Sequence, residues 1–157
     1  MDAPAAGRLA WIGLSPAPRA APLVVAEAEA LADRGLDGDH HALRRAGSRR
    51  QVTLIQAEHL RAVALELARP VAPESCRRNL VVEGLDLRAC YGRVLRVGPV
   101  RLEISGPCEP CARMEENLGP GGLAAMKDRG GLTARVLHGG RIRVGDGVRV
   151  EEPPFAR

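Results

Sequence analysis

The chain has 157 residues, a length typical of one domain, of which 45% are hydrophobic and 27% charged. This balance is typical of a globular protein and argues against a disordered chain. Aromatic residues make up only 2%, which argues against a surface that stacks single-stranded nucleic acid on aromatic rings. The net charge is +4, and because Lys127 is the only lysine, the basic side chains are nearly all arginines, which suit phosphate or carboxylate ligands.

Neither a membrane span nor an export signal is expected from the sequence. No segment approaches the roughly 18 apolar residues that a spanning helix needs. The first residues, MDAPAAGRLAWIGL, lack a charged start followed by an apolar run. We therefore expect a cytoplasmic protein with no membrane or nucleic-acid partner, whose four cysteines are thiols or ligands rather than structural disulfides.

The first half of the chain alternates apolar runs with polar turns. Residues 8–14 and 52–55 are predicted to be strands, and residues 23–31 are assigned to a further strand. The Gly-punctuated residues 33–41 are expected to form a loop. Residues 57–68 place apolar side chains at helical spacing, and the prolines that follow end this predicted helix.

The second half is dominated by short segments rich in Val, Leu and Ile, separated by glycines. Gly98-Pro99 is typical of a tight hairpin, and short helices are expected at 111–118 and 123–128. Strands are predicted at residues 79–82, 93–97, 100–104, 133–137 and 148–151. Many short strands with few helices indicate a mainly β fold, a β-barrel of short strands with a few peripheral α-helices.

The segment from Cys108 to Cys111 has the spacing of a reactive cysteine pair. It is compatible with a redox dithiol, with two buried cysteines, or with a single thiolate that reacts or binds a metal. A zinc site would need further ligands from distant residues, since only one such pair is present. Cys111 is the preferred thiolate, because it lies nearer the predicted helix start and beside Arg113.

Two further groups of polar residues could form a site. Arg77, Arg78 and Asn79 precede a predicted strand and could grip an anion or a heterocycle through forked donors and an amide edge. Asp39 and His40 belong to a Gly-Asp-His-His loop that could supply polar contacts. On residue types alone, a solvated strand end or loop tip is the favoured interpretation of each group.

The order of these segments carries more information than any one of them. The succession GLDGDHH, RRQVTLIQAEHL, RRNLVVEGLDL, GRVLRVGPVRLEISGPCEPCARME and RGGLTARVLHGGRIRVGDGV resembles the MOSC domain, named for the C-terminal domain of molybdenum cofactor sulfurases. The resemblance covers roughly residues 23–151 and is to the short, stand-alone bacterial members. It implies one MOSC domain over residues 1–157, with loose termini.

The resemblance also implies a site. In this family a cysteine carries sulfur or ligates molybdenum, and the match to CEPC gives that role to Cys111. Arg77 and Asn79 match the RxN start of the strand that grips the pterin of the molybdenum cofactor, with Arg78 between them, and Asp39 and His40 match the GDxH loop. The remaining motif segments supply site-lining candidates, namely Arg50, Thr53, Arg113 and Arg135.

What the resemblance implies for function is an oxidoreductase that binds molybdopterin and reduces N-hydroxylated small molecules. It would receive electrons from a donor protein, since no flavin, haem or iron–sulfur motif is visible. The alternative is a sulfur carrier that holds a persulfide on Cys111, supplied by a cysteine desulfurase, for metal–sulfur cofactor assembly. A third possibility is a module that only binds or inserts the cofactor. Pyridoxal phosphate is not expected here, because the desulfurase domain with its lysine is absent.

Overall fold

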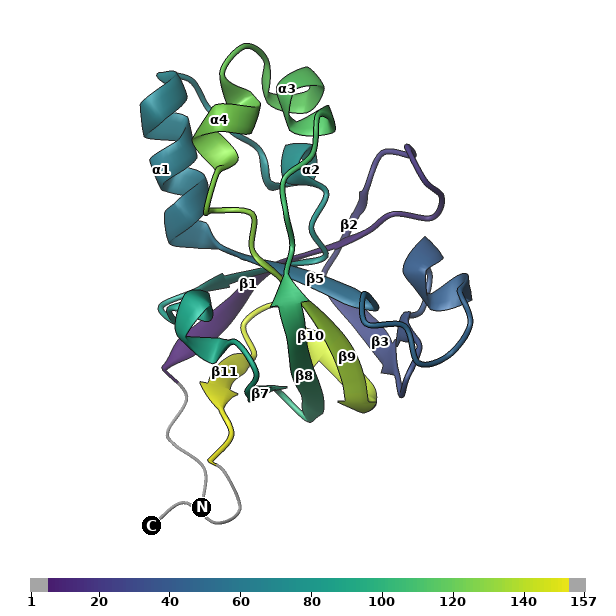
Figure 1. The fold of residues 1–157 in the computed structure, drawn as a ribbon. Helices are drawn as coiled ribbons and strands as arrows, with labels where there is room; N and C mark the ends of the chain where they lie inside the picture. Colours follow the sequence, from purple (N-terminus) through teal and green to yellow (C-terminus); the bar gives the residue numbers. More distant parts are fainter. Residues whose placement is uncertain (1–5, 153–157) are drawn as a thin grey trace.

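The computed structural model describes residues 6–152 and contains a closed barrel with helices gathered at one end (Figure 1). The strands follow one another around the barrel in the order β1 (Gly7–Leu14), β11 (Gly147–Val150), β7 (Val94–Val97), β8 (Val100–Pro107), β9 (Leu132–His138), β5 (Val52–Gln56) and β6 (Leu80–Glu83). β1 closes the barrel because it pairs with both β11 and β6. The prediction of a mainly β barrel is confirmed.

The barrel strands show the burial patterns that their positions require. In β8, inward residues such as Leu102 and Ile104 are buried and alternate with partly exposed ones, as expected for a strand with one wet face. In β5 every residue is buried, because Leu54 packs inside the barrel while Ile55 packs under the helices. β5 is therefore the wall between the barrel core and the helical layer.

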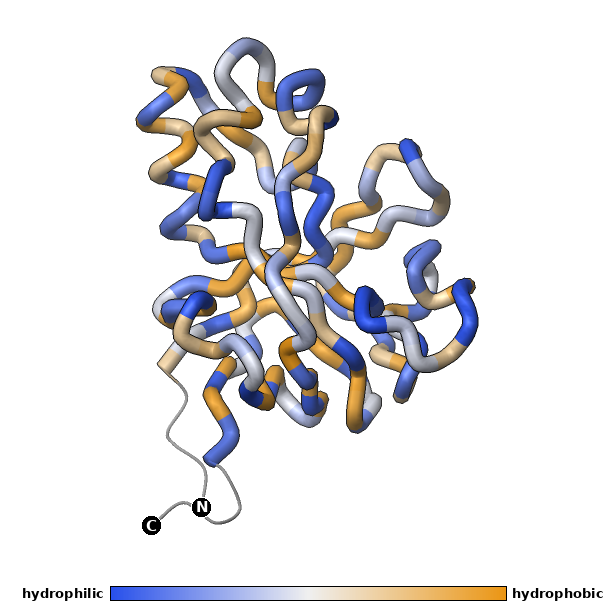
Figure 2. Tube along the Cα trace, in the orientation of Figure 1, coloured by the Kyte–Doolittle hydropathy of each residue, from blue (hydrophilic) through white to orange (hydrophobic). Residues whose placement is uncertain are grey.

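The helical layer covers the end of the barrel next to β5 and β6. It consists of α1 (Ala57–Leu67), α2 (Pro73–Cys76), α3 (Arg113–Leu118) and α4 (Gly122–Met126). Leu60 and Val63 of α1 pack with Met114 and Met126 in an apolar cluster of their own. Figure 2 shows hydrophobic and hydrophilic residues interspersed along these helices. Within residues 6–152, no helix has the length and hydropathy needed to cross a bilayer.

A small second sheet lies beside the barrel. It contains β10 (Gly140–Arg143), β3 (Glu27–Leu31) and β4 (Gly35–Leu36), while β2 (Leu23–Val25) extends the barrel sheet beyond β1. The strand predicted over 23–31 is thus two strands in two different sheets. The loop predicted over 33–41 is also partly wrong, since it contains β4 and the first residues of the 3-10 turn η1 (His40–Leu43).

Most other predicted elements are confirmed to within a few residues. The Gly98-Pro99 hairpin joins β7 to β8, with Val97 paired to Val100. The sequence patterns did not predict β10, α2 or the 3-10 turn η2 (Leu87–Cys90), all of which are only four residues long. The helix expected from residue 111 begins at Arg113, so Cys111 lies in the turn before it.

Candidate functional site: a basic cavity around Cys111

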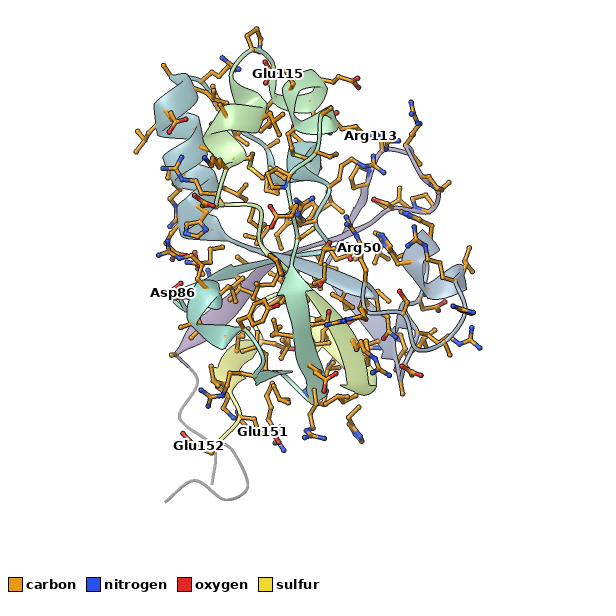
Figure 3. The ribbon with its side chains drawn as sticks, viewed as in Figure 1. Arg50, Asp86, Arg113, Glu115, Glu151 and Glu152 are labelled. Carbon is orange, nitrogen blue, oxygen red and sulfur yellow. The ribbon has the colours of Figure 1, made fainter. Side chains whose placement is uncertain are left out.

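A cavity of about 320 Å³ opens between the helical layer and the loops that flank the small sheet. Figure 3 shows two of its lining residues, Arg113 at the start of α3 and Arg50 just before β5, on the same side of the molecule. Segments far apart in sequence meet here, because β1 ends beside the first residues of its neighbours β5 and β6. The lining residues are Ser15, Pro18, Arg19, His40, His41, Arg44, Arg50, Arg77, Arg78, Cys111, Arg113 and Met114.

Cys111 presents the one exposed thiol among the four cysteines. It lies in the turn that leads into α3, where its carbonyl accepts a hydrogen bond from the backbone N–H of Met114 at 2.8 Å. Cys108, three residues earlier, is only 1% exposed and does not line this cavity. The structure therefore places the preferred cysteine of the pair at the solvent-exposed wall of a cavity that arginines also line, and its neighbour in the interior.

Cys76 and Cys90 are the two cysteines outside this segment. Both are fully buried, and burial raises the pKa of the Cys76 thiol to about 11. Burial, with the nearby charge of Asp86, also raises the pKa of Cys90. Neither thiol is suited to act as a thiolate, which agrees with a structural role.

Six arginines surround the cavity, and within residues 6–152 none of the six forms an ion pair with a carboxylate. Arginines elsewhere on the molecule do, as in the pair between Arg135 and Asp33 at 2.8 Å. Burial and the charge of Arg113 hold the pKa of Arg77 below its ordinary value. Unpaired guanidinium groups that repel one another favour an anionic ligand between them.

Arg77 lies at the junction of α2 and β6 in a left-handed backbone conformation, with φ of 57°. This residue caps the C-terminus of α2, where a left-handed conformation is common, although residues other than glycine adopt it less often. One guanidinium nitrogen of Arg77 donates to the carbonyl of Ala20, which connects the loop after β1 to the cavity rim. The arginine that the family resemblance assigns to the pterin is thus fixed at its backbone by the end of α2 and at its guanidinium group by the carbonyl of Ala20.

Arg78 is 5% exposed and connects the end of α2 to two loops. Its Nε donates to the carbonyl of Gly130 at 2.8 Å and its Nη1 to the carbonyl of Cys76 at 3.0 Å. Its Nη2 lies 3.4 Å from the carbonyl oxygen of Cys108. Arg78 therefore positions the Cys108–Cys111 segment while it contributes charge to the cavity wall.

Asp39 lies behind the cavity wall and is 1% exposed. Its carboxylate accepts hydrogen bonds from the backbone N–H of Ser15 at 2.7 Å, from the Asn79 amide at 3.0 Å, and from Nδ1 of His41 at 2.7 Å. Burial raises the pKa of Asp39, but the hydrogen bonds from His41 and Ser15 outweigh this and lower the pKa below its ordinary value. An ionised Asp39 therefore fixes the loop that carries His41.

Asn79 differs from its expected role. Its Oδ1 accepts from the backbone N–H and the hydroxyl of Thr53, and its Nδ2 donates to Asp39 and to the carbonyl of Gly13 at 3.1 Å. These four bonds use the full capacity of the amide, so none is left for a cofactor ring. Asn79 and Thr53, both buried, join β1, β5 and β6 beneath the cavity rather than line it.

The Asp39-His40-His41 group brings possible metal-ligand atoms within 4.8 Å of one another. It is nevertheless poorly suited to a cation. Both oxygens of Asp39 already accept hydrogen bonds, and the neighbouring arginines repel a positive charge. Arg135 lies outside this cavity and is paired with Asp33.

Sequence reasoning missed several cavity residues, namely Ser15, Arg19, Arg44 and His41. All four lie in segments outside the predicted strands and helices. The signal that could have found them is the run of arginines around the Gly-Asp-His-His loop, since such a concentration of unpaired charge needs a counter-ion. The same segments are the ones that connect barrel strands, where binding residues commonly lie.

A second cavity of about 260 Å³ adjoins the other members of the cysteine segment. Cys108, Pro107 and Pro110 line it together with Tyr91 and His59. Burial, followed by the charges of Arg88 and Arg129, lowers the pKa of His59. Apart from Cys108, none of the site residues predicted from the sequence lines this cavity, and it lacks the dense positive charge of the cavity around Cys111.

Comparison with known structures identifies the same fold in other proteins. The structure is similar to that of the YuaD protein from Bacillus subtilis, with a TM-score of 0.76 and 18% identity over 94% of this chain and 97% of that one. It is also similar to YiiM from Escherichia coli, with a TM-score of 0.69 and 21% identity over 93% of this chain and 70% of that one. At these identities the likeness concerns the fold.

Sequence comparison identifies the family. The uncharacterised protein YflK from Bacillus subtilis is 28% identical over 113 residues, which cover 69% of this chain. The matched region spans about half of that relative, 51% of its length. The family model described as MOSC domain matches residues 37–149, which include both the Gly-Asp-His-His loop and Cys111. The chain belongs to the MOSC domain family.

Proposed function

We propose that the cavity around Cys111 binds the molybdenum cofactor, and that the chain uses it to reduce N-hydroxylated small molecules. The observation that carries this proposal is the set of six unpaired arginines around an exposed thiol. MOSC domains are associated with this cofactor in general, and the donor set here suits its two distinctive parts. Guanidinium forks suit a phosphate, and a thiolate is a soft ligand of the kind that transition metals of this class accept.

The residues divide this work between them. Arg77 and Arg113 would grip the phosphate of the cofactor, and Arg50 and Arg44 would neutralise further negative charge at the cavity mouth. Cys111 would supply the metal ligand. When bound, the metal would exchange electrons with the substrate. Asn79 and Thr53 would keep the strands in register beneath the site, since their hydrogen bonds are satisfied inside the protein.

A second candidate function is favoured by the exposure of Cys111. A persulfide on this sulfur would be anionic, and the surrounding guanidinium groups would stabilise it until an acceptor arrived. In this sulfur-carrier role the partner would be a cysteine desulfurase, whereas the reductase role requires an electron-donor protein. Both partners are proposals that follow from the chemistry of the cavity.

Elemental analysis separates these functions. The wild-type protein and Cys111→Ser are purified from a host that makes the cofactor, and molybdenum and zinc are measured per chain. We expect molybdenum near one per chain in the wild type and its loss in the variant, with reduction of a hydroxylamino compound lost as well. Full reductase activity in Cys111→Ser would rule out the proposed role of the thiol.

The sulfur-carrier function has its own test. After incubation with a cysteine desulfurase and cysteine, intact mass spectrometry of the wild type would show one added sulfur that Cys111→Ser lacks. Absence of molybdenum together with this added sulfur would favour the carrier over the reductase. Stoichiometric zinc would contradict both functions.

A further inference from the structure

The two histidines of the turn η1 form an unusual part of the cavity wall. The rings of His40 and His41 lie with their centroids 4.1 Å apart and their planes inclined by 32°, and both residues line the cavity. The match of the Gly-Asp-His-His loop to the family motif does not explain why two imidazoles lie among six arginines. The proposed binding of an anion by those arginines does not explain it either. The hydrogen bonds of the rings show what each can offer a ligand.

Both rings are fixed in the same tautomer when neutral. Nδ1 of His40 lies 2.9 Å from the carbonyl oxygen of Ser15, and because a carbonyl only accepts, this nitrogen must carry the proton. Nδ1 of His41 lies 2.7 Å from the carboxylate of Asp39, which likewise only accepts. In each neutral ring Nε2 is therefore a bare lone pair, and within residues 6–152 no hydrogen bond engages it.

The Nε2 lone pairs of His40 and His41 are hydrogen-bond acceptors, whereas the arginines that line the same cavity offer only donors. A guanidinium group has five N–H donors and no acceptor, so the arginines alone would suit any anion of the right size. We propose that His40 and His41 are the acceptor side of the cavity, and that its ligand is an anion which also carries an O–H or N–H donor. The pair would then select against anions of the same size and charge that have no proton to donate.

The two histidines would discriminate between anions because a buried acceptor nitrogen without a hydrogen-bond donor costs free energy. An anion with a hydroxyl can place its O–H on Nε2 while its other oxygens bind the arginines. An anion without one would place an oxygen lone pair against a nitrogen lone pair, or would leave both without a partner. A metal ion would also suit two bare imidazole nitrogens, but the surrounding arginines disfavour a cation.

The inference deepens the proposed function, on which it rests for the choice of cavity, and its test needs neither molybdenum nor enzymatic activity. Inorganic phosphate and sulfate are the probes. At about pH 8 both are mainly dianions of similar size, and only hydrogen phosphate carries an O–H. The readout is protection of Cys111, in the same cavity, from alkylation by iodoacetamide, followed by mass spectrometry of metal-free protein.

We expect phosphate to protect Cys111 at a concentration about tenfold lower than sulfate, which is the selectivity that one well-placed hydrogen bond to a charged ligand supplies. In His41→Leu and His40→Leu the ratio should fall toward one, while both anions still bind the arginines. His138→Leu is the matched control, because His138 is exposed at the end of β9 and does not line the cavity, and it should keep the tenfold ratio.

Three results would overturn the proposal. They are equal protection by the two anions in the wild type, protection by neither anion, and protection by zinc at concentrations where phosphate has no effect. A second measurement avoids any question of folding in the variants. Long-range ¹H–¹⁵N NMR of the wild-type side chains should show His40 and His41 as Nδ1–H tautomers, and an Nε2–H tautomer in either would also overturn it. Failure here would leave the molybdenum analysis unaffected, so the two proposals fail separately.

Discussion

The side-chain amide of Asn79 donates a hydrogen bond across 3.0 Å to the carboxylate of Asp39, 40 residues earlier in the chain. Two motifs that look independent in the sequence are therefore one buried network. The amide also bonds to Thr53 and Gly13, so the network joins three barrel strands to the loop that carries His41. The cavity rests on this network, so loss of the network should lower the free energy of unfolding.

Replacement of Asn79 tests the network directly. In Asn79→Ala the carboxylate of Asp39, the N–H of Thr53 and the carbonyl of Gly13 each lose a buried partner. We expect the free energy of unfolding to fall by about 2–4 kcal/mol, measured by urea denaturation. Asn117→Ala is the control, because Asn117 is exposed and makes one bond to Ser75, and it should cost less than about 1 kcal/mol. Equal losses in the two variants would contradict the network.

Thiol labelling tests the burial of the cysteines. In native protein, a thiol reagent should modify one cysteine per chain rapidly, and Cys111→Ser should abolish that reaction. Cys76, Cys90 and Cys108 should react only after unfolding, because burial shields them and, for Cys76, raises the pKa to about 11. Denatured wild type, with all four thiols accessible, is the control. Rapid labelling of two cysteines in the native state would show that the Cys108 segment is open.

Much of the architecture could be predicted from the sequence because the barrel strands carry strong local signals. Residues 100–104 alternate apolar and polar side chains, and Gly98-Pro99 specifies the hairpin before them. The missed elements lack such signals. β4 has two residues, and its Gly35 adopts φ of 136° close to the carbonyl of Gln51, a tertiary contact that no local pattern encodes.

The site was predictable in part for a related reason. Cys111, Arg77 and Arg113 lie in motifs, and the structure places all three in one cavity. The internal use of Asn79 could not be foreseen, because an amide at a strand entrance can face a ligand or the interior with the same sequence. The place of His41 in the cavity wall could not be predicted either, because a hydrogen bond to Asp39 that exists only in the folded chain orients its ring.

The attachment of the end of β11 to β7 and β8 should depend on pH through Glu151, which follows β11. Hydrogen bonds from Arg101, on β8, and Arg96, on β7, outweigh burial and lower the pKa of Glu151 from 4.5 to about 2. A carboxyl whose folded pKa is depressed stabilises the fold above its ordinary pKa, and that contribution is lost as the pH falls from about 4.5 to about 2.

Glu151→Gln tests this dependence. The variant should lose about 1 kcal/mol near neutral pH, since the pair is partly solvated, and its stability should fall less steeply than that of the wild type between pH 4.5 and 2. Thermal denaturation at several pH values measures both effects. Parallel stability profiles for the two proteins would show that Glu151 does not contribute through its charge.

Substitution of two glycines that have similar φ angles distinguishes the effect of backbone strain from the effect of close packing. Gly131 has φ of 89°, and a Cβ there would lie 1.9 Å from the carbonyl oxygen of Leu54. Gly92 has φ of 73°, but nothing lies within 4 Å of its Cβ position. We expect Gly92→Ala to cost about 1 kcal/mol from strain alone, and Gly131→Ala to cost about 3 kcal/mol or more. Similar melting temperatures for the two variants would argue against the close approach of Gly131 to β5.

Arg78→Lys tests whether this arginine positions the cysteine segment or only supplies charge. Lysine keeps the positive charge but cannot reach the carbonyls of Gly130, Cys76 and Cys108 together, so at least one buried carbonyl loses its donor. We expect the free energy of unfolding to fall by about 1–2 kcal/mol and, in native protein, Cys108 to become reactive toward iodoacetamide.

The matched control for that change is Arg113→Lys, because Arg113 lines the same cavity but makes no hydrogen bond to those carbonyls. It should weaken anion binding while leaving Cys108 protected. If charge were all that Arg78 supplied, both lysine variants would keep Cys108 unreactive and would unfold at the wild-type denaturant concentration. A reactive Cys108 in Arg78→Lys alone would instead show that the arginine holds the wall between the basic cavity and the interior, so that the exposed thiol of Cys111 and the buried thiol of Cys108 keep their separate environments.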